Sequence, residues 1–206
     1  MAVHFFYNIA FDLWQIFGYQ PRAIIRALWI LFGVYWLVSA LKRKKTKKRE
    51  SWLQRMLYVL PLVFAFVLLS RPEAGHGWLG ARFLPDSPVV EWIGVLLTAA
   101  GVVVAFWARA HLGSNWSGVV TLKQGHELIR TGPYRTIRHP IYTGILLSML
   151  GTVAAMGEVR ALIAFFIVCM SLYIKARREE SFLSAEFGPR FVEHRQHTGM
   201  FLPRVS

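Results

Sequence analysis

Long apolar runs separated by short polar segments dominate the chain. Five runs stand out, at residues 24–41, 52–70, 89–108, 140–157 and 161–174. Because a helix needs about 20 apolar residues to cross the hydrocarbon core of a bilayer, the pattern predicts about five transmembrane helices. The last two runs are separated only by residues 158–160, which indicates a tight helical hairpin.

The first 19 residues have a different pattern. His4, Asn8, Asp12 and Gln15 recur at spacings of four, four and three, so they share one face of a helix. This spacing predicts an N-terminal amphipathic helix that lies in the membrane interface. The expected fold is therefore all-α, a polytopic membrane protein with about five transmembrane helices plus that amphipathic helix.

Composition and charge narrow the class of protein. The 206 residues are 55% hydrophobic and carry a formal net charge of +13. This combination is typical of a membrane protein with basic loops, and we expect no nucleic-acid partner. The single cysteine, Cys169, lies in an apolar run, which excludes a disulfide framework and a zinc site built on several cysteines. No metal site is expected.

The distribution of cations predicts the orientation in the membrane. If residues 42–49 face the cytoplasm, then residues 109–139 and the tail from residue 175 face it too. This side then carries 18 of the 24 Lys and Arg residues, as the positive-inside rule requires. We divide the chain into residues 1–108, with the interfacial helix and three spans, and a C-terminal half, 109–206, with the hairpin and the tail.

The segment 128–144 concentrates the polar chemistry. Gly132 and Pro133 predict a turn. His139 precedes a proline and is pushed out of helical geometry, whereas Pro140 suits the first position of a helix. Arg138 and His139 would then lie at a helix N-terminus, where an anion is favoured. A juxtamembrane loop that meets lipid phosphates explains this segment equally well.

A second polar segment follows the last apolar run. The helix is expected to continue into the cytosol through residues 175–187 and to end at Gly188 and Pro189. Lys175, Arg178 and Glu179 share one of its faces, so this helix and the cation-rich turn can enclose one pocket. An exposed helix with ordinary Arg–Glu pairs is the alternative.

Together these segments resemble a known family. The ordered set comprises His126-Glu127-Leu128, Gly132-Pro133-Tyr134, Arg138-His139-Pro140-Ile141-Tyr142-Thr143-Gly144, Arg178-Glu179-Glu180 and Phe187-Gly188. It resembles the isoprenylcysteine carboxyl methyltransferases and the related membrane phospholipid methyltransferases. Residues 109–117 are similar to bacterial members, which suggests the bacterial inner membrane, and the loop charges place the active site on its cytoplasmic side.

The resemblance implies S-adenosylmethionine as methyl donor, S-adenosylhomocysteine as product and a cytosolic cofactor pocket formed by the C-terminal half. The residues that match the donor-binding segments, or that lie next to them, are His126, Glu127, Leu128, Ile129, Tyr134, His139, Pro140, Ile141, Tyr142, Gly144, Glu179 and Glu180. The expected catalytic residues are Glu179, Arg138, Lys175 and Arg178. Lys175 aligns near a basic residue that the family uses toward the substrate carboxylate.

The chemistry suits these residue types. A carboxylate acceptor is already an anion, so methyl transfer needs alignment of the two reactants and no strong base. The helix N-terminus at His139 could hold the donor's carboxylate, and Glu179 could pair with its cationic or hydroxyl groups. Lys175 or Arg178 could anchor an anionic acceptor. An amine acceptor must lose a proton, and Glu179 or Glu180 would then be the candidate base.

Several functions stay open on the sequence. The acceptor is expected to be a lipophilic molecule or lipid that arrives from the bilayer, and the expected reaction is carboxyl O-methylation of an isoprenylcysteine-like substrate. The alternatives are N-methylation of an aminophospholipid, an NADPH-dependent membrane reductase of the sterol reductase type, and a catalytically silent scaffold. The sequence does not determine the oligomeric state.

Overall fold

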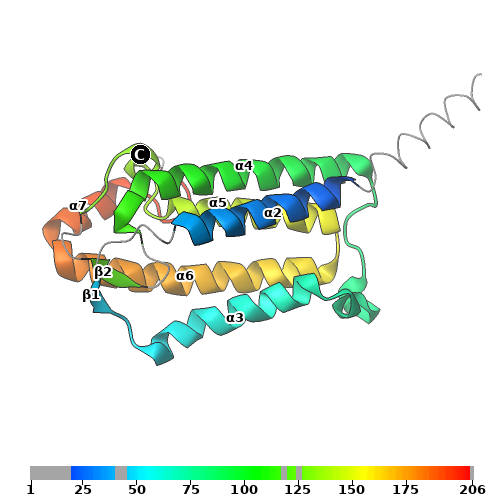
Figure 1. The fold of residues 1–206 in the computed structure, drawn as a ribbon, viewed down its shortest axis with the longest axis horizontal. Coiled ribbons are helices and arrows are strands. Elements are labelled where there is room, and N and C mark those ends of the chain that lie inside the picture. The colour runs from blue at the N-terminus through cyan, green and yellow to red at the C-terminus, as the bar shows by residue number, and fades with distance from the viewer. Residues whose placement is uncertain (1–19, 40–45, 117–119, 124–126, 205–206) are drawn as a thin grey trace, which may run out of the picture.

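A computed structural model of the protein describes residues 20–39, 46–116, 120–123 and 127–204. Within them lie six α-helices and two short strands (Figure 1). The helices are α2 (Gln20–Ser39), α3 (Trp52–Ser70), α4 (Pro88–Leu112), α5 (Pro140–Met156), α6 (Val159–Phe187) and α7 (Pro189–His197); the strands are β1 (Thr46–Arg49) and β2 (Thr121–Lys123). Short 3-10 turns lie between them, among them η4 (Gly132–Arg135).

The helices confirm a polytopic membrane protein. Four of them are long and apolar enough to cross a membrane, at Pro21–Ser39, Trp52–Ser70, Pro88–Asn115 and Val159–Phe187. The fifth apolar helix, α5, has 17 residues and is shorter than these four. The count of five apolar helices therefore agrees with the sequence, whereas their number as spans remains a prediction. The predicted amphipathic helix lies outside the described residues.

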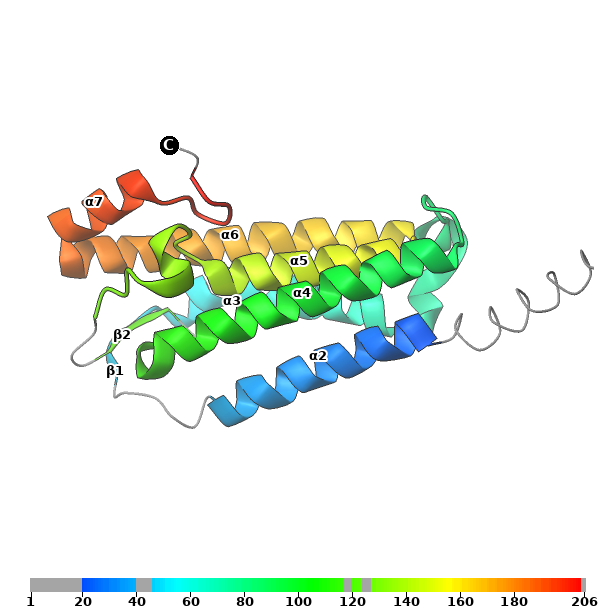
Figure 2. The ribbon, with the colours of Figure 1, turned by 90° about the horizontal axis from the view of Figure 1, so that it is seen from above.

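The centre of the bundle is the pair α4 and α5, and it is built on small residues. A Cβ atom added to Gly101 would lie 2.4 Å from the carbonyl oxygen of Gly144, and one added to Gly144 would lie 2.5 Å from that of Gly101. Only glycine lets the two backbones approach so closely. α2 packs on α4, and α3 packs on α6 (Figures 1 and 2).

The strands form a small addition to the predicted all-α fold. β1 and β2 pair antiparallel, with Thr46 opposite Lys123 and Arg49 opposite Thr121. Just past the ribbon, the Glu50 N–H donates to the carbonyl of Val120 over 3.1 Å. The pairing satisfies backbone groups of two loops, and it attaches the start of α3 to the segment after α4. The basic run at residues 42–49 predicted no such contact.

The connecting segments collect at two opposite ends of the bundle (Figure 1). β1, β2, η4 and α7 lie at one end. The α3–α4 connection and the α5–α6 turn meet at the other end. There the backbones of Arg82 and Glu158 pair as an isolated antiparallel β-bridge. The segments predicted to face the cytoplasm therefore share one end. The side of the membrane they face and the division of the chain at residue 108 remain predictions.

Candidate active site

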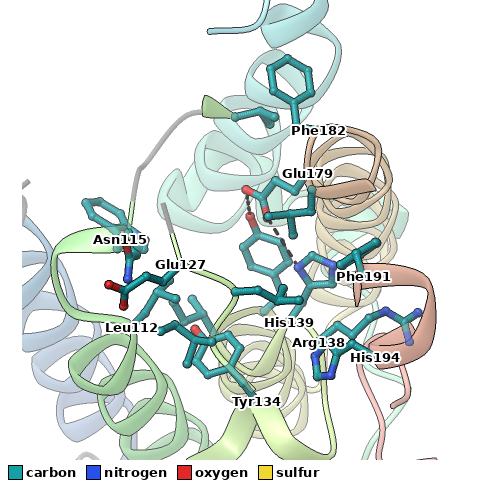
Figure 3. Close-up of a pocket in the computed structure, with 17 residues that line it drawn as sticks. Leu112, Asn115, Glu127, Tyr134, Arg138, His139, Glu179, Phe182, Phe191 and His194 are labelled. Atoms are coloured by element: carbon teal, nitrogen blue, oxygen red, sulfur yellow. Dashed lines mark hydrogen bonds and ion pairs between the residues drawn. The ribbon is translucent and has the colours of Figure 1, made fainter. Parts of the chain in front are cut away.

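A cavity of about 130 Å³ lies at the end of the bundle that carries α7. Its walls come from the end of α4, the segment 127–139, the first turn of α5, the last turns of α6, and α7 (Figure 3). Figure 3 places Glu127 and Asn115 on one side of it, and Glu179, His139 and Phe191 on the other. The lining is mostly apolar and aromatic, with a few charged groups.

The turn at Gly132 sets one wall. Gly132 has a φ of +56°, a conformation that glycine adopts without strain, and a Cβ there would lie 2.7 Å from the ring of His111. The turn buries Tyr134, whose hydroxyl donates to the carbonyl of Ala108 over 3.3 Å. Burial, followed by the charge of Glu179, raises the pKa of the Tyr134 phenol well above its usual value. Tyr134 therefore lines the cavity as a neutral ring.

His139 is the buried centre of the site, with 6% of its surface exposed. It is the residue before α5, and Pro140 takes the first helical position, as the sequence predicted. Its Nδ1 lies 3.5 Å from Glu179 Oε2, and its Nε2 lies 3.3 Å from Glu180 Oε1. Burial alone would lower the pKa of His139, but hydrogen bonds and charges from the two glutamates raise it. The two glutamates thus favour the charged form of the imidazole.

The two consecutive glutamates of α6 have different surroundings. Glu179 lines the cavity and accepts a hydrogen bond from the Tyr142 hydroxyl over 2.6 Å. Glu180 turns away from the cavity and accepts one from Arg138 Nε over 2.7 Å. The ring of Tyr142 stacks on that of His139, with centroids 5.4 Å apart. Glu179 is therefore the carboxylate available to a ligand, whereas Glu180 holds Arg138 and His139 in place.

The segment Thr198–Phe201, called the strap below, packs against the residues that precede α5. The N–H groups of Arg138 and His139 donate to the carbonyls of Gly199 and Met200 over 2.9 and 3.1 Å. These backbone donors precede α5, where the sequence suggested a place for the donor's carboxylate. Because the strap uses both, these two donors are not available to the carboxylate of the methyl donor.

The structure places most of the predicted residues together. The predicted residues that line the cavity are Glu127, Leu128, Ile129, Tyr134, Arg138, His139, Ile141, Tyr142 and Glu179. Pro140 is buried at the start of α5, and Gly144 packs against α4, away from the lining. Lys175 lies with its Nζ 5.4 Å from the centre of the Tyr142 ring. His126 lies outside the described residues.

Arg178 lies beside Glu179 on α6 but does not line the cavity. Its Nε is buried, and it has no hydrogen-bond partner within the described part of the chain. A buried N–H without a partner is costly, and Arg178 therefore enters the proposal below as a candidate for pairing with an anion.

Sequence reasoning missed other lining residues: Leu112, Asn115, Trp116, Val120, Phe182, Leu183, Phe191 and His194. Helical periodicity could have found Phe182 and Leu183, which follow Glu179 by three and four residues. Phe191 and His194 belong to the short helix α7, which the sequence did not predict. Trp116 is held by Arg109, whose guanidinium carbon lies 4.4 Å from its ring.

Comparisons with known proteins agree with these motifs. A family model described as phospholipid methyltransferase matches residues 89–190. A probable protein-S-isoprenylcysteine O-methyltransferase of Oryza sativa subsp. indica is 28% identical over 196 residues, which cover 91% of this chain and 97% of that protein. The cobalt-zinc-cadmium resistance protein CzcN of Cupriavidus metallidurans is 31% identical over 147 residues, which cover 70% of this chain and 62% of that protein.

Among solved structures, a eukaryotic intramembrane Ras methyltransferase, isoprenylcysteine carboxyl methyltransferase, is similar in fold. Its TM-score is 0.51 at 23% sequence identity, and the match covers 71% of this chain and 52% of that chain. The resemblance predicted from the motifs is confirmed by these matches.

Proposed function

Because the chain belongs to the phospholipid methyltransferase family, we propose that it transfers a methyl group from S-adenosylmethionine to a lipophilic acceptor. The proposed acceptor group is the carboxylate of an isoprenylcysteine-like substrate. The observation that carries the proposal is the cavity carboxylate of Glu179, fixed by the Tyr142 hydroxyl and by the His139 cation. Glu179 belongs to the motif on α6, whereas His139 and Tyr142 belong to the motif at the start of α5.

The residues of the cavity suit the donor. Glu127 and Glu179 offer carboxylates on two of its sides, which match an ammonium group and ribose hydroxyls. The aromatic rings of Trp116, Tyr134 and Phe182 offer flat apolar surface for a purine. Both kinds of group line the same cavity.

The bound donor supplies an activated methyl group on a sulfonium. In the proposed transfer the bond from methyl to sulfur breaks, a bond to a carboxylate oxygen forms, and neutral S-adenosylhomocysteine leaves. No proton moves, so the residues act by alignment and by exclusion of water. Tyr134, buried and neutral, and the apolar walls keep the reacting groups out of water.

Two cations of α6 are proposed to receive the acceptor's carboxylate. Lys175 lies one helical turn before Glu179, and the buried Nε of Arg178 has no hydrogen-bond partner among the described residues. Leu53, Leu57 and Leu60 of α3 are exposed, as expected of side chains that face lipid. An apolar acceptor can therefore approach α6 from the bilayer while its charged group reaches the loop-rich end, which we place in the cytoplasm.

N-methylation of an aminophospholipid is the second candidate, since the matching family model is that of the phospholipid methyltransferases. An amine acceptor must lose a proton before or during transfer. Glu179 is then the candidate base, because Glu180 is occupied by Arg138 and His139.

A calorimetric titration of the detergent-purified protein with S-adenosylhomocysteine, beside one with NADPH, tests the class of enzyme. We expect S-adenosylhomocysteine to bind and NADPH not to bind. His139→Ala should lose the binding of S-adenosylhomocysteine. His197→Ala, an exposed histidine of α7, is the matched control and should bind normally. Binding of NADPH alone would make the protein a reductase, and binding of neither ligand by folded protein would favour a scaffold.

A further inference from the structure

Two buried polar side chains near the start of α3 have no explanation in the family motifs. Tyr58 is 2% exposed and Glu50 is 8% exposed, and both lie outside the matched residues 89–190. The Tyr58 hydroxyl donates to Glu50 Oε1. The same oxygen accepts the Val120 N–H over 3.3 Å, whereas Glu50 Oε2 is buried without a hydrogen-bond partner among the described residues. Burial of a carboxylate is costly, which suggests that the pair serves more than packing.

The ring of Tyr58 faces Lys175 of α6, one of the two residues proposed to receive the acceptor's carboxylate. The Nζ atom of Lys175 lies 5.7 Å from the centre of this ring and 5.4 Å from the centre of the Tyr142 ring. Both distances are within the range of cation–π attraction, so two tyrosines from different helices attract one ammonium group. Lys175 is thereby restrained at the junction of α3, α5 and α6.

This junction adjoins the cavity without being part of its lining. Tyr142 and Val120 line the cavity, whereas Lys175 and Tyr58 do not. Tyr142 therefore borders both the Lys175 ammonium and the proposed donor space. α3 packs on α6 and carries exposed leucines, so this ammonium lies near the lipid-facing side. A carboxylate carried on a lipid tail would reach Lys175 there, one helical turn from Glu179.

We infer that Glu50 and Tyr58 are positioning residues for the acceptor: Tyr58 holds the Lys175 ammonium where it binds the acceptor's carboxylate, and Glu50 fixes the Tyr58 ring. The inference rests on the proposed methyl transfer to a carboxylate. It gives the motif-free N-terminal half a part in substrate recognition. The pair would set the affinity for the acceptor and leave the affinity for the donor unchanged.

The geometry can be tested without knowing the acceptor. In protein labelled with ¹³C-lysine, the side-chain NMR signal of Lys175, identified by its loss in Lys175→Arg, should show the displacement that two nearby aromatic rings cause. Tyr58→Leu should remove a large part of this displacement, and Tyr58→Phe should keep most of it because the ring remains. Tyr173→Leu, which changes an exposed tyrosine of α6, is the control. Equal signals in wild type and Tyr58→Leu would overturn the inference.

The role toward the acceptor is tested with N-acetyl-S-farnesylcysteine, a prenyl thioether with a free carboxylate. We expect Tyr58→Leu and Glu50→Gln to raise its KM at least fivefold while the Kd of S-adenosylhomocysteine stays within twofold. Tyr58→Phe should raise the KM less than Tyr58→Leu. Glu73→Gln, at an exposed glutamate, is the control.

The outcomes separate this inference from the proposed function. An unchanged KM, or a parallel loss of donor affinity, would contradict the positioning role while leaving methyl transfer intact. If wild type bound S-adenosylhomocysteine but did not methylate the prenyl acid, the acceptor role of Lys175 would fail. If wild type did not bind S-adenosylhomocysteine at all, the proposed function itself would fail.

Discussion

The helix α5 is held in two different ways along its length. Its middle lies against α4 through backbone contacts at Gly101, Gly144 and Gly151, with hydrogen bonds such as Ser148 Oγ to the carbonyl of Thr98 over 3.1 Å. Its N-terminal end lies among charged groups, where Arg138 and His139 meet Glu179 and Glu180. One contact is neutral and close, and the other is ionic and borders a cavity.

The difference shows how one helix can serve two purposes. Close packing of small residues gives rigidity in a membrane, where apolar side chains gain little from leaving lipid. Buried charges give little net stability, because removing them from water is costly. Their presence at one end of α5 is therefore better explained by ligand binding. The close packing of α5 on α4 holds this charged end in a rigid position.

The largest effect is expected at the charged end, from Glu180→Ala. It leaves the buried Arg138 guanidinium and the His139 cation without their shared carboxylate, which should lower the free energy of unfolding by about 3 kcal/mol or more. Chemical unfolding in detergent micelles measures the change. A loss below about 1 kcal/mol would show that Glu180 contributes little to holding the charged end.

The next effect is expected at the packed middle, from Gly101→Ala. The new Cβ would meet backbone atoms of α5 at 2.4 Å, and separating the helices should cost about 2 kcal/mol of unfolding free energy. Gly33→Ala on α2 is the matched control. No atom lies within 4 Å of its new Cβ, so stability should stay the same or rise. The Gly101→Ala protein that remains folded should bind S-adenosylhomocysteine as wild type does, and a selective loss of binding would contradict the division between the two regions.

A pH dependence distinguishes the two regions further. Because the pKa of His139 is raised in the folded protein, its ion pairs stabilise the fold at pH values below the pKa of an unfolded histidine. This stabilisation is lost as the pH rises through the raised pKa. The stability difference between wild type and His139→Gln should therefore shrink toward alkaline pH, whereas that for Gly101→Ala should stay constant. A difference for His139→Gln that grows with pH would contradict the charged state of the imidazole.

The smallest effect is expected at the exposed surface of α7, from Glu193→Gln. Its ion pair with Arg130, at 3.2 Å, is largely exposed, so its loss should change the unfolding free energy by less than about 0.5 kcal/mol. Donor affinity should not change. A large loss of stability would show that ionic contacts outside the buried group of Arg138, His139, Glu179 and Glu180 also stabilise this end of the bundle.

The sequence predicted much of the fold because hydrophobic length and helix-ending residues are local signals. The run 52–70 corresponds to α3 residue for residue, and the end of α6 at Gly188 and Pro189 is confirmed. The ribbon of β1 and β2 was missed because its pairing joins residues more than 70 positions apart, and a basic run carries no signal for its partner.

The candidate site was predicted unevenly for the same reason. Tyr134, His139, Tyr142 and Glu179 came from compact motifs, and the structure brings them together around one cavity. The difference between Glu179 and Glu180 depends on which side of α6 faces Arg138, and two adjacent glutamates do not reveal it. The strap at residues 198–201 and the pair Glu50–Tyr58 depend on distant contacts and were not predicted.

The most direct test of the account is the affinity of Glu179→Gln for S-adenosylhomocysteine, measured by calorimetry beside wild type and Glu193→Gln. The substitution keeps the size of the side chain and removes the charge that the cavity offers to the donor. We predict at least a tenfold loss of affinity, about 1.4 kcal/mol, with Glu193→Gln unchanged. Wild-type affinity in a folded Glu179→Gln protein would contradict the assignment of this cavity to the methyl donor.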